Sequence, residues 1–331
     1  MKYRKLGRTD LDVSVVCHGC WSIIHKDPTW GGNDLNESIS AIHTSLDAGV
    51  NFFDTAEMYG SGESEEILAK AFAGRRQEVV IADKVLTADL EPEKLKQACE
   101  RSLRRLKSDY IDLYQIHWPS REVPVADSLA AMEQLKAEGK IRAIGVSNFG
   151  VSFLEEAVAA GGVETNQLCY NLLWRPIEHS VQPLCVENDI GVLCYSPICQ
   201  GLLAGKFSSA DEVPPGRART RLFSRDHPQA VHDERGCEAE AFQAIDEIRD
   251  ICRSVGEPMG NVAMAWLLAR PGVTSVVVGG RSAAQAAENA GAGDLELPAD
   301  VVEALSAATE KVKERAGTNC DFWQSATRME R

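Results

Sequence analysis

Eight short segments of almost continuous apolar residues recur along this chain of 331 residues. Runs without polar alternation are typical of strands buried on both faces, as in a parallel sheet. The runs are Val13–Cys17, Val50–Phe53, Val79–Ala82, Tyr110–Ile116, Ile141–Val146, Val163–Gln167, Ile190–Tyr195 and Val273–Val278. Most of the stretches between them have helical periodicity. Strands that alternate with helices eight times predict an α/β fold of the closed (β/α)8 type, the TIM barrel.

The remaining segments add a hairpin and one long loop to this pattern. A helix is expected from Pro92 to about Lys107, because proline suits a first helical turn and apolar residues follow at helical spacing. Lys2–Leu11 has the appearance of a short N-terminal hairpin. Phe207–Gly236 follows the seventh run, is rich in Pro, Gly and charge, and predicts a long loop. Since no linker or internal repeat is present, residues 1–331 are expected to form a single domain.

The composition argues against several classes of function. A formal net charge of -14 and a pI near 5.0 disfavour a nucleic-acid partner, because phosphate backbones are bound by excess positive charge. The N-terminal segment lacks the apolar core of a signal peptide, and no run of roughly 18 apolar residues predicts membrane insertion. The 10 scattered cysteines are therefore expected to be reduced thiols of a cytoplasmic protein. The oligomeric state is left open.

Four polar residues follow or close the apolar runs: Asp54, Tyr59, Lys84 and His117. A polar residue at the end of a buried strand is typical of the active-site mouth of a barrel or an open α/β sheet. Each of the four alone has an ordinary structural explanation, such as a half-buried tyrosine or a buried Lys–Asp pair. Together a carboxylate, a phenol, an amine and an imidazole make a site for proton transfer, and the four are therefore catalytic candidates.

Longer stretches around these residues resemble the aldo-keto reductase superfamily, whose members are NADPH-dependent carbonyl reductases on a (β/α)8 barrel. The matching stretches follow the family's order and span nearly the whole chain. They are Asn51–Gly60, Ile81–Val85, Asp109–Pro119, Lys140–Phe149, Asn166–Gln167, Tyr195–Lys206 and Val276–Asn289. Trp30-Gly31-Gly32 and the long loop resemble the bacterial and potassium-channel β-subunit-like branch. The resemblance implies a reductase of small aldehydes or ketones, with NADPH as cofactor and the hairpin plugging the barrel.

The resemblance and the chemistry imply the same roles for the four candidates. Carbonyl reduction places a hydride on carbon and a proton on oxygen, and Tyr59 is the expected proton donor. Lys84 would lower the pKa of Tyr59 from about 10 towards neutrality, and Asp54 would keep Lys84 charged and in place. His117 would orient the carbonyl oxygen through a hydrogen bond.

The resemblance also implies a set of cofactor-binding residues, since no Gly-x-Gly-x-x-Gly motif follows a strand. Ser147, Asn148 and Gln167 would hold the nicotinamide carboxamide, and Tyr195 would stack on the ring. Arg281 would bind the adenosine 2′-phosphate beside a helix N-terminus. The full set is Cys20, Trp21, Asp54, Ser147, Asn148, Gln167, Tyr195, Ser196, Pro197, Ile198, Gly201, Leu203, Lys206, Gly279, Arg281, Gln285, Glu288 and Asn289. No metal is expected.

The first strand and Asp83 depart from the family pattern. Cys17-His18-Gly19-Cys20 contains a CxxC, but no second CxxC accompanies it, so we favour plain thiols beside the cofactor over redox or metal chemistry. Cys17 and His18 stand where relatives carry a Gly-Leu-Gly run, which leaves the local fit at the barrel mouth open. Asp83 stands where Thr is more usual, and its carboxylate would raise the pKa of Lys84 if it pointed inward.

Several residues near the expected mouth have two interpretations. Substrate contacts are predicted for Trp21, Tyr59, His117 and Trp118. Trp30, Met58 and Trp174 fit either a substrate wall or core packing. The loop arginines Arg217, Arg219, Arg221 and Arg225 fit either a lid over the cofactor phosphates or a solvated face. Phe322 and Trp323 fit either the border of the mouth or docking of the tail.

Two other functions fit the same sequence. One is a regulatory subunit that senses nucleotide, binding NADPH tightly and turning over slowly. The other is an NAD-dependent dehydrogenase of a sugar alcohol or inositol, and cofactor preference around Arg281 would distinguish it. The physiological substrate depends on loop conformations that the sequence does not determine.

Overall fold

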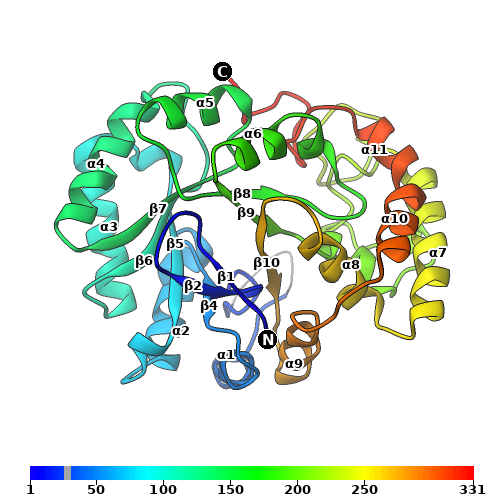
Figure 1. Cartoon of the computed structure of the whole chain (residues 1–331), viewed down its shortest axis with the longest axis horizontal. Helices are drawn as coiled ribbons and strands as arrows, with labels where there is room; N and C mark the ends of the chain where they lie inside the picture. Colours follow the sequence, from blue (N-terminus) through cyan, green and yellow to red (C-terminus); the bar gives the residue numbers. More distant parts are fainter. Residues whose placement is uncertain (26–30) are drawn as a thin grey trace.

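A computed structural model describes residues 1–25 and 31–331 of the chain. Within these residues, parallel strands close into a barrel in the order β3-β4-β5-β6-β7-β8-β9-β10 (Figure 1). Their bounds are Val16–Gly19, Phe52–Asp54, Val80–Val85, Ile111–Ile116, Ile141–Ser147, Thr165–Cys169, Gly191–Tyr195 and Val273–Gly279. The last strand pairs with the first, with Val277 opposite Cys17, so that the sheet has no free edge. The predicted (β/α)8 barrel is confirmed.

Helices surround the barrel on its outer face (Figure 1). They are α1 (Leu35–Asp47), α2 (Glu63–Ala71), α3 (Pro92–Leu106), α4 (Val125–Ala137), α5 (Val151–Ala159), α6 (Val181–Glu187), α7 (Glu238–Val255), α8 (Met259–Leu268), α9 (Ala283–Gly291), α10 (Ala299–Ala308) and α11 (Glu310–Ala316). The expected helix from Pro92 begins there, and it ends before Lys107, whose left-handed backbone (φ 50°) stops it. In the described part of the chain, no helix is long and apolar enough to cross a bilayer.

The N-terminal hairpin covers the end of the barrel where the strands begin. Strands β1 (Tyr3–Lys5) and β2 (Asp12–Ser14) pair in antiparallel fashion. The hairpin therefore reaches beyond the predicted Leu11, and Val13 belongs to it rather than to the first barrel strand. Gly7 packs against the backbone of Glu164, the residue before β8. The contact is so close that a Cβ at position 7 would clash with the Glu164 carbonyl oxygen. The hairpin thus plugs the barrel, as the family resemblance implies.

Alternate residues of each strand face two different cores. The interior core includes Ala82 of β5 and Leu113 of β6, together with Leu6, Leu11 and Val13 from the hairpin segment. The larger core lies between the strands and the helices and includes Ile81. This alternation along β5 places Lys84 on the inner side with Ala82, and Asp83 on the helix side with Ile81.

The long loop after the seventh barrel strand is confirmed between β9 and α7. Arg221 anchors it: its side chain is buried, pairs with Glu234 at 2.8 Å and donates to the Asn319 and Asp321 carbonyl oxygens of the C-terminal tail. Arg225 also bonds within the loop, to the Asp233 carbonyl oxygen. The contacts of these two arginines hold the loop to itself and to the tail, and of the two interpretations the lid therefore does not apply to them.

Candidate active site

The four catalytic candidates converge at the end of the barrel where the strands finish. Asp54 is the last residue of β4, Lys84 lies near the end of β5, and His117 directly follows β6. Tyr59 begins the short turn Tyr59–Gly62, which precedes α2. Parallel strands bring their carboxyl ends to one rim, and residues distant in sequence therefore meet.

Lys84 is the centre of the group. Its Nζ lies 2.6 Å from Asp54 Oδ1, 2.7 Å from the Thr55 carbonyl oxygen and 3.3 Å from the Tyr59 hydroxyl. Burial would lower the pKa of Lys84, but the Asp54 carboxylate and the Tyr59 hydroxyl outweigh it and raise the pKa above its ordinary value. Lys84 is therefore a fully buried, permanently charged ammonium directed at a phenol.

The pKa of Tyr59 differs in direction from the sequence-based expectation. Burial raises it most, and the Lys84 ammonium opposes this only in part, so that the pKa lies above its ordinary value. The prediction that Lys84 brings this pKa towards neutrality is not met in this structure, because the barrel mouth desolvates the phenolate. Tyr59 is consequently protonated at neutral pH, which is the state that a proton donor needs.

His117 lies beside Tyr59 as a neutral imidazole. The two ring centroids are 6.0 Å apart in an edge-on arrangement. Burial and then the Lys84 charge lower the pKa of His117 well below its usual range. Trp21 stacks on Tyr59, with near-parallel rings whose centroids are 6.0 Å apart. A substrate oxygen near Tyr59 would thus meet a neutral hydrogen-bonding group and an apolar wall.

Asp83 points away from this group, towards α2. Burial and the Glu65 carboxyl group raise the pKa of Asp83 well above its ordinary value. Glu65 in turn pairs with Arg105 of α3 at 2.9 Å. Asp83 therefore does not point inward to the Lys84 ammonium, as the proposed effect on the pKa of Lys84 would require. A threonine at this position would remove a buried carboxyl from the helix layer rather than from the active site.

A cavity of about 680 Å³ opens above the catalytic group. Small-molecule and cofactor sites have volumes of roughly 300–1,000 Å³, and the cavity lies within that range. Polar groups near its floor are mutually bonded: Gln167 Nε2 donates to Asp54 Oδ2 at 2.7 Å, and Asn148 Nδ2 donates to the His117 carbonyl oxygen at 3.1 Å. The Tyr195 hydroxyl donates to Asn148 Oδ1 at 2.9 Å. Asn148 has a strained left-handed backbone (φ 61°), which is frequent at functional sites.

The opposite end of the cavity is suited to phosphate. The N-terminus of α9 is capped by Ser282, whose Oγ accepts from the Gln285 amide. Arg281 precedes this helix, lines the cavity and donates to the Gly31 and Gly32 carbonyl oxygens. Arg217 comes from the long loop to the same region: burial and then the Arg281 charge lower its pKa. Two guanidinium groups beside a helix N-terminus form a site for a phosphate group.

Most of the predicted cofactor-binding residues line this one cavity. They are Trp21, Asp54, Ser147, Asn148, Gln167, Tyr195, Ser196, Pro197, Ile198, Gly201, Lys206, Gly279, Arg281, Gln285, Glu288 and Asn289. Cys20 and Leu203 are fully buried and do not line it, because their side chains point into the surrounding core. The residues fit a dinucleotide, with a polar pocket at one end and a cationic one at the other.

The residues predicted to contact substrate also line this cavity. Tyr59, His117, Trp118 and Met58 line the cavity with Trp21. Trp174 is buried in the core, with its Nε1 bonded to the Cys320 carbonyl oxygen, and core packing is the correct interpretation for it. Trp30 lies outside the described residues. Of the loop arginines, Arg217 and Arg219 line the cavity.

Sequence reasoning missed most of the C-terminal contribution to the mouth. Trp323, Gln324 and Arg328 line it. The Arg328 guanidinium lies 3.7 Å from the centre of the Trp118 ring and is bound by the fully buried Asp321 at 2.9 Å. Of the two tail aromatics, Trp323 borders the mouth, whereas Phe322 is buried in the core. Arg328 carries no local motif that would indicate its position.

The CxxC of the first barrel strand and His18 are enclosed in the protein. Cys17 and Cys20 are buried free thiols, and burial raises the pKa of each. Among the described residues, no group of three or more His, Cys, Asp or Glu side chains is placed to hold a metal ion. His18 points outward to α1, where its Nδ1 lies 2.7 Å from Ser45 Oγ. It is a structural histidine of the helix layer.

His18 gives the fold a pH-dependent stability. Burial lowers the pKa of His18 from 6.5 to about 4. As the pH falls below 6.5, His18 gains a proton in the unfolded chain but not in the folded chain. The folded state therefore loses stability as the pH falls from 6.5 to about 4. Between about pH 7.5 and about pH 5, His18 should cost about 2 kcal/mol of unfolding free energy. Urea unfolding at about pH 7.5 and about pH 5 measures this decrease in unfolding free energy, which should be smaller in His18→Asn than in the wild type. The exposed His25→Asn is the control and should keep the wild-type loss; equal losses in both variants would contradict the assignment.

Comparison with known proteins agrees with this geometry. The family model described as "Aldo/keto reductase family" matches residues 15–310. An aldo-keto reductase of Bacillus subtilis, YhdN, is 34% identical over 296 residues, which are 86% of each chain. The NADH-specific methylglyoxal reductase of Escherichia coli is 34% identical over 323 residues, covering 90% of this chain and 95% of that protein.

Two further comparisons are more distant in sequence. A probable voltage-gated potassium channel β subunit of rice is 28% identical over 335 residues, covering 95% of this chain and 98% of that protein. A crystal structure of an aldo/keto reductase from Klebsiella pneumoniae in complex with NADP and acetate is 28% identical, covers 89% of this chain and 91% of its own, and superposes with a TM-score of 0.71. By sequence, barrel and site, the chain belongs to the aldo/keto reductase family of nicotinamide-dependent oxidoreductases.

Proposed function

We propose that this protein is an NADPH-dependent reductase that converts aldehydes or ketones to alcohols, with Tyr59 as the proton donor. The observation that carries the proposal is the position of the Tyr59 hydroxyl. It lies at the floor of the cavity, 3.3 Å from the Lys84 ammonium, which Asp54 holds at 2.6 Å. Because β3 and β10 pair to close the barrel, residues 1–331 would act as a single catalytic domain.

The proton step follows from the state of each side chain. A bound nicotinamide would supply the hydride. Tyr59 is protonated at neutral pH because burial raises its pKa, and it would donate its proton to the carbonyl oxygen. The resulting phenolate is stabilised by the Lys84 ammonium, whose charge Asp54 maintains. His117 is neutral and would orient the carbonyl oxygen through a hydrogen bond without competing for the proton.

The preference for NADPH over NADH rests on the cationic end of the cavity. Arg281 and Arg217 are close enough for one charge to lower the pKa of the other. A 2′-phosphate would relieve that repulsion, whereas the 2′-hydroxyl of NADH would not. The NADP-bound relative of Klebsiella pneumoniae supports this preference. The NADH-specific relative of Escherichia coli supports the alternative of an NAD-dependent enzyme, and the two cofactors must therefore be compared directly.

The first test is oxidation of NADPH by the purified protein with a reactive aromatic aldehyde. Turnover with NADPH that exceeds turnover with NADH supports the proposal and justifies a substrate screen. The similarity to the rice channel subunit supports a second candidate function, that of a nucleotide-sensing regulatory subunit. Tight binding of NADPH without turnover would favour that function instead.

Replacing Arg281 with alanine should change cofactor preference. The variant loses a charge-assisted contact to the 2′-phosphate, so the KM for NADPH should rise about tenfold to a hundredfold while the KM for NADH changes little. The NADH measurement also controls for the loss of the Arg281 bonds to Gly31 and Gly32. Arg235→Ala removes an exposed arginine of the long loop that does not line the cavity, and it should leave both values unchanged. Equal rises for NADPH and NADH in Arg281→Ala would overturn the assignment.

A further inference from the structure

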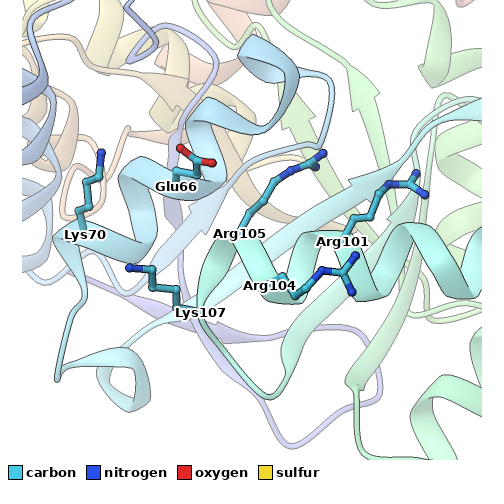
Figure 2. A pocket seen from close by; sticks show the side chains of 6 residues that line it. All are labelled: Glu66, Lys70, Arg101, Arg104, Arg105 and Lys107. Atoms are coloured by element: carbon cyan, nitrogen blue, oxygen red, sulfur yellow. The ribbon is translucent and has the colours of Figure 1, made fainter.

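A second cavity, of about 540 Å³, lies outside the barrel between α2 and α3. Figure 2 shows its lining: two side chains come from α2, three arginines come from α3, and one lysine comes from the end of α3. The six residues, here called the basic cleft, are Glu66, Lys70, Arg101, Arg104, Arg105 and Lys107. None of them lines the larger cavity at the barrel mouth.

The charge of the basic cleft is opposite to that of the whole chain. Five of the six lining side chains are cationic, in a protein whose formal net charge is -14. Lys70, Arg104 and Lys107 are exposed, and within residues 1–25 and 31–331 none of the three has an ion pair. An anion bound among these side chains would be attracted by their charge.

The two inner arginines are held in fixed positions. Arg101 is bound by Glu57 at 3.2 Å and also by Asp89. Arg105 is bound by Glu65 at 2.9 Å and packs on the backbone of Gly62, where a Cβ would stand 2.5 Å from its Nε. Their side chains are still 35% and 27% exposed, and both residues line the cleft. Groups ordered before binding lose little entropy when a ligand arrives.

The lining indicates which anion would fit. No aromatic side chain is among the six lining residues, so the basic cleft provides no surface for stacking a nucleobase. Guanidinium groups match the geometry of phosphate oxygens, and the flanking lysines and Arg104 add charge for a second phosphate group. We propose that the basic cleft binds a compact phosphate polyanion, of the size and charge of pyrophosphate, at a site separate from the barrel mouth.

The test is calorimetric titration of pyrophosphate into the protein saturated with NADP, so that the phosphate-binding end of the barrel mouth is filled. The cleft variant is Lys70→Gln/Arg104→Gln, which spares Arg101 and Arg105 because they hold Glu57 and Glu65. The control variant is Lys136→Gln/Lys311→Gln, which removes the same charge from α4 and α11.

We expect binding of one pyrophosphate to the wild type, weakened at least about fivefold in the cleft variant and unchanged in the control, with affinity falling as salt is added. The absence of binding to the wild type would overturn the proposal, as would equal affinities of the two variants. Because both variants keep the barrel mouth intact, failure of this proposal leaves the proposed reductase function unaffected. Failure of reductase activity would likewise leave the comparison of the two variants valid.

Discussion

Replacing Tyr59 with phenylalanine is expected to lower kcat for aldehyde reduction by about 10²–10⁴-fold, the range for loss of a positioned general acid. The variant keeps the ring between Trp21 and His117 and removes only the hydroxyl 3.3 Å from Lys84 Nζ. Binding of NADPH should therefore change little. Steady-state kinetics and fluorescence titration of NADPH measure the two quantities separately.

A matched control for this variant is Tyr110→Phe. Tyr110 packs under the Arg76 guanidinium, 4.3 Å from its ring centre, and does not line the cavity. Its replacement should leave kcat within about twofold of the wild type, because it makes no contact with the reacting group. If Tyr59→Phe retained the activity of Tyr110→Phe, another group would have to be the acid.

Replacing Lys84 with methionine is expected to reduce both activity and stability. The variant leaves the Asp54 carboxylate buried, 2% exposed, without its cation. Removal of one partner from a buried ion pair costs about 3–5 kcal/mol, and the free energy of unfolding should fall by that amount. Urea unfolding measures it, and activity should fall as well, because the phenolate of Tyr59 would lose its stabilising charge.

The double variant Asp54→Asn/Lys84→Met separates the loss of the pair from the loss of packing. An asparagine at position 54 keeps an oxygen for Gln167 Nε2, which donates to Asp54 at 2.7 Å in the wild type. The double variant should be more stable than Lys84→Met, with a coupling energy of at least about 2 kcal/mol. If the losses of unfolding free energy in Asp54→Asn and Lys84→Met add up to the loss in the double variant, the pair is not coupled in the folded state.

The barrel could be predicted because its evidence is local. Each strand buried on both faces gives an apolar run, and helices show apolar residues at helical spacing, with Pro92 marking the start of α3. The first strand was misjudged because one apolar run, Val13–Cys17, covers the end of the hairpin and the start of the barrel. The hairpin strand ends at Ser14, whose Oγ donates to the Val16 carbonyl oxygen at 2.7 Å, and the barrel strand begins at Val16; no composition rule marks that break.

The candidate site was predictable where residues follow strands, since the topology then brings them to one rim. Asp54, Lys84 and His117 are of this kind. Arg328 is not: its position depends on Asp321 and on docking of the tail, which Glu330 secures by accepting from the Val151 and Ser152 amides at 2.7 and 2.8 Å. Such contacts join segments far apart in sequence and leave no local pattern.

The raised pKa of Tyr59 was equally beyond sequence reasoning. An adjacent lysine lowers the pKa of a phenol and burial raises it, and the balance depends on how deeply the ring is enclosed. The pattern of residues reveals the partners but not the depth of burial. The same limit applies to Asp83. Strand alternation predicts that its side chain points to the helix layer, but its pairing with Glu65 depends on how α2 packs on the barrel.

The most direct test of the central claim is the fate of deuterium placed on the nicotinamide C4 of NADPH. The protein is incubated with an aromatic aldehyde and NADPH labelled on one face or the other, and the alcohol is analysed by mass spectrometry. A fixed nicotinamide presents only one face to the substrate, so deuterium should pass to the alcohol from one labelled form and not from the other. An alcohol without deuterium from either form, or none formed at all, would contradict hydride transfer in this site.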